Sequence, residues 1–142
     1  MASTFYIEII TPERTFFCGE VESLIVNTVG GEMGVLKGNI PLVTALVSGE
    51  IKLKVKDKWY YAANSDGFLE VTPSKTVIFC QTVFWPDEMK DADLKEKERH
   101  HREALANARD EKTYYLAKVS LMRTMAKLNV KYQHENDVFL DK

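Results

Sequence analysis

The sequence predicts an α+β chain in two parts: a small antiparallel β-sandwich over residues 1–86, followed by an antiparallel two-helix hairpin over residues 87–142. Three observations predict this division. All 7 glycines and all 4 prolines lie at or before Pro86, so nothing beyond it interrupts a helix. Short runs of alternating apolar residues, typical of strands, fill the first part. The second part carries 12 acidic and 12 basic side chains in 56 residues, which is typical of helices with a wide solvated face.

The first part has the pattern of short strands separated by turns. Residues 51–55 alternate apolar side chains with lysines, which predicts one buried and one solvated face. Turn residues at 56–58 and 72–75 join neighbouring strands into hairpins. Many short strands with a turn about every 8–12 residues favour a sandwich or a barrel. We therefore expect two small sheets. The expected strands cover residues 5–10, 21–26, 51–55, 59–63, 68–71 and 76–80, and the glycine-rich segment 30–34 is expected to be a turn.

The second part has the pattern of two helices joined near residues 107–112. Asp87 and Glu88 place carboxylates at the expected start of the first helix, where the helix dipole favours them. Residues 95–103 are all charged or histidine, so this helix has few apolar anchors. The second helix has an apolar stripe that consists of Tyr114, Ala117, Leu121, Met125, Leu128 and Tyr132. With so few anchors, we expect about 3–6 kcal/mol to hold the hairpin to the sandwich, so that a partner can release it.

Composition and spacing exclude several classes of function. A net charge of −2 lacks the basic face that a general nucleic-acid-binding protein needs. No run of about 18 apolar residues is present to span a membrane, and the N-terminus lacks the basic region of a secretory signal. Cys18 and Cys80 are expected to be buried thiols in a reducing compartment. No spacing suggests a phosphate loop, a metal site or a catalytic cluster, so neither a stand-alone enzyme nor a cofactor is expected.

Several short motifs carry a resemblance to a known family. Thr11-Pro12-Glu13-Arg14 comes first, followed by Phe17-x-Gly19-x-Val21-Glu22. Residues 31–36 then have the sequence Gly-Glu-Met-Gly-Val-Leu, residues 39–46 contain Pro-Leu-x-Thr, and residues 67–71 have the sequence Gly-Phe-Leu-Glu-Val. In this order and spacing the chain resembles the epsilon subunit of the bacterial F-type rotary ATP synthase, from about Phe5 to Val130. Members of that family have a small β-sandwich followed by a helical hairpin.

The resemblance implies a non-catalytic subunit of the central stalk, the rotor of that enzyme. The sandwich would join the gamma subunit and rest on the loops of the c-subunit ring, which couples ion-driven rotation to ATP synthesis. The hairpin would lie on the sandwich, or extend toward the catalytic alpha and beta subunits and restrain ATP hydrolysis. The resemblance also implies a peripheral position on the cytoplasmic face of the bacterial cell membrane, with no nucleic-acid partner and no cofactor.

The resemblance further implies which residues make these contacts. The ring and gamma interface is expected to include Glu32, Met33, Asn39, Ile40, Pro41 and Leu42. The basic residues expected to dock the hairpin or to restrain hydrolysis are Arg99, Arg102, Arg109, Lys118, Arg123 and Lys127. Pro86 is expected to be the hinge. A solvated turn carboxylate is the other interpretation of Glu32, and ordinary helix solvation is the other interpretation of each basic residue.

At two positions the chain departs from the family pattern in the sandwich. Asn39 stands where the family usually has histidine, and Asn can still form a hydrogen bond there. Asp66 stands in place of the first glycine of the family's Gly-Gly-Phe, which is Asp66-Gly67-Phe68 here. Because Asp tolerates left-handed backbone angles, we expect the turn to survive this change.

The alternative function is a nucleotide-sensing subunit whose hairpin binds ATP. Some bacterial members bind ATP through an Ile/Leu-Asp-x-x-Arg-Ala motif after Trp-Pro-x-Glu. Here Trp85-Pro86-Asp87-Glu88 is followed by Lys90 and Asp93 at the positions of the motif's Asp and Arg, so both charges are reversed. Because an aspartate repels phosphates, we expect weak or no ATP binding. A tail from about residue 133 extends past the resemblance, and its Val138-Phe139-Leu140 either docks on a partner or frays.

Overall fold

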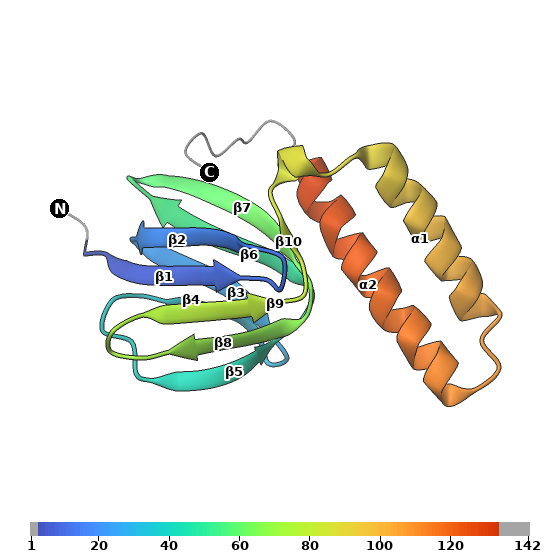
Figure 1. Ribbon diagram of the computed structural model, residues 1–142, viewed down its shortest axis with the longest axis horizontal. Coiled ribbons are helices and arrows are strands. Elements are labelled where there is room, and N and C mark those ends of the chain that lie inside the picture. Colours follow the sequence, from blue (N-terminus) through green and yellow to red (C-terminus); the bar gives the residue numbers. More distant parts are fainter. Residues whose placement is uncertain (1–2, 134–142) are drawn as a thin grey trace.

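Figure 1 shows the computed structural model, in which a β-sandwich lies beside two antiparallel helices. The structure describes residues 3–133, so Val138-Phe139-Leu140 lies outside the described residues. The strands are β1 (Phe5–Ile10), β2 (Thr15–Val21), β3 (Ser23–Thr28), β4 (Gly31–Val35), β5 (Leu42–Leu46), β6 (Gly49–Val55), β7 (Lys58–Asn64), β8 (Gly67–Val71), β9 (Thr76–Cys80) and β10 (Val83–Phe84). The helical elements are the 3-10 helix η1 (Pro86–Glu88), α1 (Asp91–Ala106) and α2 (Glu111–Gln133). The predicted fold class is confirmed.

The strands form one continuous path of hydrogen-bonded neighbours that folds into two layers. The path runs β10-β7-β6-β3-β5-β8-β9-β1-β2, and β4 pairs with β3 beside it. In Figure 1, β1, β9, β8 and β5 lie in front and β3 and β6 lie behind. Among the described strand pairs, only β1–β9 is parallel, from Ile7↔Thr76 to Ile10↔Phe79. A parallel pair needs a long crossover connection, which the intervening strands supply.

The main core lies between the two layers. The largest fully buried side chains are Ile7, Ile9, Leu24, Ile51, Leu53, Leu69 and Ile78. Trp85 is 2% exposed at one end of this core, and its ring stacks on Phe16 with the ring centroids 4.5 Å apart. A second, smaller cluster joins Ala63 of β7 to four residues of the linker and the hairpin, namely Met89, Leu94, Leu128 and Val130. The sandwich therefore has its own core, and the hairpin adds only a small one.

Both predicted hairpins of the sandwich are confirmed. β6 and β7 pair from Gly49↔Asn64 to Val55↔Lys58. Lys56 and Asp57 turn the chain between them with φ angles of 51° and 67°, as a two-residue hairpin turn requires. β8 and β9 pair from Gly67↔Cys80 to Val71↔Thr76.

Other strands differ from the prediction. β2, β4 and β5 are additional strands, and the predicted strand 21–26 is found two residues later as β3. The prediction of a turn over residues 30–34 is wrong, because only Val29 and Gly30 turn and the next five residues pair with β3. Glycines in β4 and polar residues in β2 hide the alternation that marks a strand, whereas pairing with a neighbour needs only the backbone. Cys18 on β2 is exposed, contrary to the prediction, whereas Cys80 is buried and its burial raises its pKa to about 12.

The linker and the first helix begin differently from the prediction. Asp87 and Glu88 belong to η1, and α1 begins only at Asp91. Among the described residues, no helix is long and apolar enough to cross a membrane.

The buried surface of α2 also differs from the predicted stripe. Its buried residues are Ala117, Leu121, Thr124, Leu128 and Val130. The stripe residues Tyr114, Met125 and Tyr132 are instead 48%, 43% and 55% exposed. Ala117, Leu121, Thr124 and Leu128 still follow one stripe at steps of 3 or 4, turned slightly from the predicted one. Val130 lies on another side of α2, which is placed between the sandwich and α1 (Figure 1).

Candidate functional site

Glu32, the acid expected to face the ring, lies on β4 directly after the β3–β4 turn. It is opposite Asn27 in the sheet. Its carboxylate is exposed, and Oε2 accepts a hydrogen bond from Lys52 Nζ at 3.3 Å. Val29, at the tip of the same turn, is 81% exposed, and Met33 packs partly against the core. This turn therefore presents the apolar Val29 side chain beside the Glu32 carboxylate. Because the ion pair of Glu32 with Lys52 is exposed, a partner can take the place of Lys52 at little cost in free energy.

The other residues expected at the ring and gamma interface lie at the opposite end of β4. Asn39, Ile40 and Pro41 belong to the connection from β4 to β5, and Leu42 begins β5. Ile40 is 78% exposed, whereas Leu42 packs partly against the core. Asn39 donates a hydrogen bond from Nδ2 to the Ile40 carbonyl at 3.4 Å. The structure therefore separates the six residues into two groups, one at each end of β4.

The outer face of β5, β8 and β9 carries exposed apolar side chains that the sequence prediction missed. Val43, Phe68 and Phe79 are 70%, 47% and 41% exposed. Phe68 lies opposite Phe79 in the sheet, with the ring centroids 5.3 Å apart. A groove of about 620 Å³ runs beside them and is also lined by Ile10 and Pro12. A signal was present, since residues 77–79 are apolar at every position, which is typical of a strand covered on both faces.

The linker is fastened to the sandwich beyond Pro86. Arg14 donates from Nη1 and Nη2 to the two carboxylate oxygens of Glu88, at 2.9 and 3.0 Å. Glu88 Oε1 also accepts a hydrogen bond from the Trp85 amide at 2.8 Å. The bonds to Glu88 raise the pKa of Arg14, whose guanidinium lies 5.2 Å from the centroid of the Phe16 ring. A bidentate charged pair of this kind holds its partners in one geometry, so η1 and its buried Pro86 are part of the sandwich.

α2 holds the hairpin against the sandwich through apolar and ionic contacts. Leu128 and Val130 pack in one cluster with Ala63 of β7. Arg123 donates from Nε to Asp66 Oδ1 at 2.7 Å, and its Nη2 lies 2.6 Å from the same oxygen. These contacts combine one apolar cluster with a charged pair in which both nitrogens approach a single oxygen, and Lys131 Nζ also donates to the Pro86 carbonyl at 3.2 Å.

The six basic residues named for the hairpin do not form one surface. Arg123 and Lys127 face the sandwich, with Lys127 Nζ 4.7 Å from the centroid of the Phe84 ring. Burial, followed by the charges of Lys97 and Arg123, lowers the pKa of Lys127. The other four basic residues are exposed, and these are Arg99, Arg102, Arg109 and Lys118.

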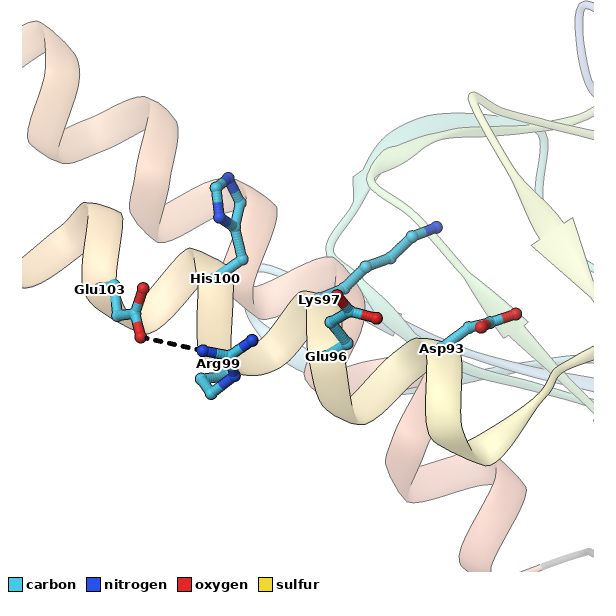
Figure 2. A pocket seen from close by; sticks show the side chains of 6 residues that line it. All are labelled: Asp93, Glu96, Lys97, Arg99, His100 and Glu103. Carbon is cyan, nitrogen blue, oxygen red and sulfur yellow. Dashed lines mark hydrogen bonds and ion pairs between the residues drawn. The ribbon is translucent and has the colours of Figure 1, made fainter.

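The outer face of α1 carries mixed charges instead of a basic patch. Figure 2 shows the six side chains around a shallow hollow on this face: Asp93, Glu96, Lys97, Arg99, His100 and Glu103. Arg99 Nη1 lies 3.4 Å from Glu103 Oε1, and Arg102 Nε lies 3.6 Å from Glu98 Oε1. Exposed pairs of this kind contribute little to stability, so they stay available to a partner. Within residues 3–133, no group of three His, Cys, Asp or Glu side chains could hold a metal ion.

Comparison with known proteins agrees with this architecture. The model of the family described as ATP synthase, Delta/Epsilon chain, beta-sandwich domain matches residues 4–86. The ATP synthase epsilon chain of Ruminiclostridium cellulolyticum is 35% identical over 127 residues, which cover 89% of this chain and 95% of that protein. The ATP synthase epsilon chain of Caldanaerobacter subterraneus subsp. tengcongensis is 34% identical over 136 residues, which cover 94% and 99%.

Solved structures show the same fold. A chain of the Euglena gracilis mitochondrial ATP synthase, in a structure of OSCP, F1 and the c-ring, matches with a TM-score of 0.75 and 19% identity, covering 89% of this chain and 80% of that one. A chain of the Tetrahymena thermophila central stalk and c-ring matches with a TM-score of 0.63 and 13% identity, covering 92% and 98%. The sequence matches extend over both the sandwich and the hairpin, and so the chain belongs to the ATP synthase delta/epsilon chain family, with epsilon chains as its relatives.

Proposed function

We propose that this chain is a non-catalytic rotor subunit of ATP synthase, in which the sandwich holds the central stalk together and the hairpin restrains ATP hydrolysis. The observation that carries this function is the unequal anchoring of the two parts. The sandwich core joins residues from ten strands and the linker, whereas the hairpin shares one small cluster and a few polar contacts with it. One part is built to stay in place and the other to leave.

The sandwich offers two surfaces for the rotor contacts. The exposed apolar face around Val43, Phe68 and Phe79 fits a stable partner such as the gamma subunit, because burying these side chains on assembly is favourable. The turn with Val29 and Glu32 fits the polar loops of the c-ring, where a basic side chain can replace Lys52. With these partners the chain would lie at the periphery of the membrane, on its cytoplasmic face in a bacterium.

Two cations of the hairpin become available to the catalytic subunits only after it leaves the sandwich. Arg123 and Lys127 are occupied by Asp66 and Phe84 in the docked arrangement. Release would expose both cations and the apolar side chains of α2 together, and acidic loops of the alpha and beta subunits are the matching surface. Arg99, Arg102, Arg109 and Lys118 are exposed in either arrangement and can add to this contact.

The pivot of this movement lies just beyond Pro86. η1 is held by the Arg14–Glu88 pair, and Met89 has extended backbone angles before α1 begins. The chain can therefore change direction at Met89–Lys90 without breaking the Arg14–Glu88 pair. This position lies about three residues beyond Pro86, where the hinge was expected.

Nucleotide binding is not favoured by the pocket at the base of the hairpin. This pocket of about 230 Å³ is lined by Lys90, Asp93, Lys97 and Lys127, among others. Asp93 and Glu88 place two carboxylates among the lysines of this lining, and carboxylates repel phosphates. The arrangement supports regulation through protein contacts and weak or absent ATP binding.

Reversing the charge of Glu32 tests the contact with the ring. Glu32→Lys is expected to leave the stability of the isolated chain unchanged, because the carboxylate is exposed and has one weak partner. Its affinity for a reconstituted gamma and c-ring assembly should fall by about tenfold or more, as expected for the loss of a charge-assisted hydrogen bond. The measurement is titration of the assembly with labelled chain, together with ATP-driven ion pumping. Glu13→Gln, an exposed acid in the β1–β2 connection, serves as the control. Equal affinity of Glu32→Lys and wild type would contradict the ring contact.

A further inference from the structure

The contact between Asp66 and Arg123 is better organised than an ordinary surface ion pair. Asp66 lies between β7 and β8, at the rim of the sandwich that faces α2. Two nitrogens of Arg123 approach one carboxylate oxygen of Asp66, at 2.7 and 2.6 Å. The two residues are 57 positions apart in the chain, so the contact ties the hairpin to the sandwich directly.

The backbone on both sides of Asp66 is fixed by the sandwich. Asn64 and Ser65 are 3% and 1% exposed. Asn64 Nδ2 donates to the Val47 carbonyl, and Ser65 exchanges hydrogen bonds with Thr82 through its amide and its hydroxyl. On the other side, a Cβ on Gly67 would lie 1.9 Å from the Phe79 carbonyl oxygen, so glycine lets the chain lie directly against β9 there. The backbone that carries the Asp66 carboxylate is therefore positioned by the sandwich itself.

Arg123 is held in position from the helix side. Its neighbours Leu121 and Thr124 are 7% and 4% exposed in the surface that α2 buries. The Arg123 side chain itself is 35% exposed, and that of Asp66 is 50% exposed. The pair is therefore anchored at both backbones, yet it remains open to salt and to a competing carboxylate.

We propose that Asp66 and Arg123 form a latch that biases the hairpin toward the docked position, and that an acidic partner surface favours release by taking Arg123 from Asp66. The latch sets how often the hairpin is free. Removing it should raise the released fraction about two- to fivefold at low ionic strength, as measured for exposed ion pairs. The role of the latch in regulating hydrolysis rests on the proposed function, whereas the latch itself does not.

Thiol labelling of the full-length chain measures the released fraction directly. Ala63 is 1% exposed in the cluster beneath α2, so Ala63→Cys in a Cys18→Ser background reacts with a thiol reagent only when the hairpin leaves. Cys80, buried in the sandwich core, reacts only on global unfolding and is the internal control. Asp66→Asn and Arg123→Gln should each raise the labelling rate at residue 63 about two- to fivefold and leave that of Cys80 unchanged. The increase should shrink at high salt.

Two further variants separate the latch from general charge effects. Asp57→Asn removes an acid of the sandwich that pairs with Lys54 and not with α2. It should leave the labelling rates at residue 63 and at Cys80 unchanged. The double variant Asp66→Arg/Arg123→Asp should restore slow labelling. If Asp66→Asn labels no faster than Asp57→Asn, the latch is overturned.

Hydrolysis by the reconstituted enzyme then separates the latch from the proposed function. Faster labelling together with lower hydrolysis in Asp66→Asn supports both. Faster labelling with unchanged hydrolysis supports the latch and overturns the restraint of hydrolysis by the hairpin.

Discussion

Trp85→Ala is expected to lower the free energy of unfolding of this chain by about 3–5 kcal/mol. Trp85 is 2% exposed, stacks on Phe16 and meets the edge of Phe17 with the ring centroids 6.5 Å apart. Its loss would leave a large cavity at the end of the sandwich core, while the backbone amide of residue 85 would still donate to Glu88. Chemical denaturation followed by circular dichroism measures this change.

A second tryptophan in the same sandwich provides the matched control. Trp59 lies on β7 and is only half-buried, so Trp59→Ala should lower the free energy of unfolding by less than about 2 kcal/mol. If the two variants lose the same stability, Trp85 does not have the packing role that the structure gives it.

Removing residues 89–142 is expected to leave a folded sandwich and to raise ATP hydrolysis by the assembled enzyme. The increase should be about twofold or more, because we expect the hairpin to restrain at least half of the enzyme molecules. This truncation keeps both Trp85 and the Arg14–Glu88 ion pair, so the sandwich core and η1 stay complete. The part removed shares with the sandwich the small cluster around Ala63, the Arg123–Asp66 pair and the contact of Lys127 with Phe84, and none of these belongs to the main core. Steady-state hydrolysis is measured after reconstitution with the other subunits.

The design of the truncation includes its own control. A chain that ends at Trp85 lacks Glu88 and should assemble with the same partners but unfold at a lower denaturant concentration. If the enzyme hydrolyses ATP at the same rate with the full chain and with the chain ending at Glu88, the hairpin does not restrain this enzyme.

Local patterns were enough to predict the two parts and the most regular strands. Residues 51–55 alternate along a strand that buries one face, residues 59–63 were expected to return as its hairpin partner, and β6 and β7 confirm the prediction. Gly31–Val35 was misassigned because glycine is a turn signal in a local pattern, whereas in the sheet its backbone simply pairs with β3. The predicted stripe of α2 was correct at Ala117, Leu121 and Leu128 and wrong at Tyr114, Met125 and Tyr132, because a single stripe assumes one neighbour and α2 has two.

The contacts that matter most for the proposed function could not be predicted in the same way. Arg14 and Glu88 are 74 positions apart, and each is an ordinary charged residue in its own segment. Asp66 stood out as a departure from the family pattern, but only the fold reveals Arg123 as its partner. Likewise, the sequence suggested one interface from residue 32 to residue 42, and the length of β4 separates it into two.

The position of α2 in the assembled enzyme tests the central claim most directly. Spin labels on cysteines placed at Ser74 and Lys112, both exposed, report the distance between the sandwich and the start of α2 in a Cys18→Ser background. In the enzyme at rest, with hydrolysis restrained, the distance distribution should differ from that of the isolated docked chain. During ATP synthesis driven by an ion gradient, it should return to the docked distribution. A docked distribution in the restrained enzyme would contradict the account.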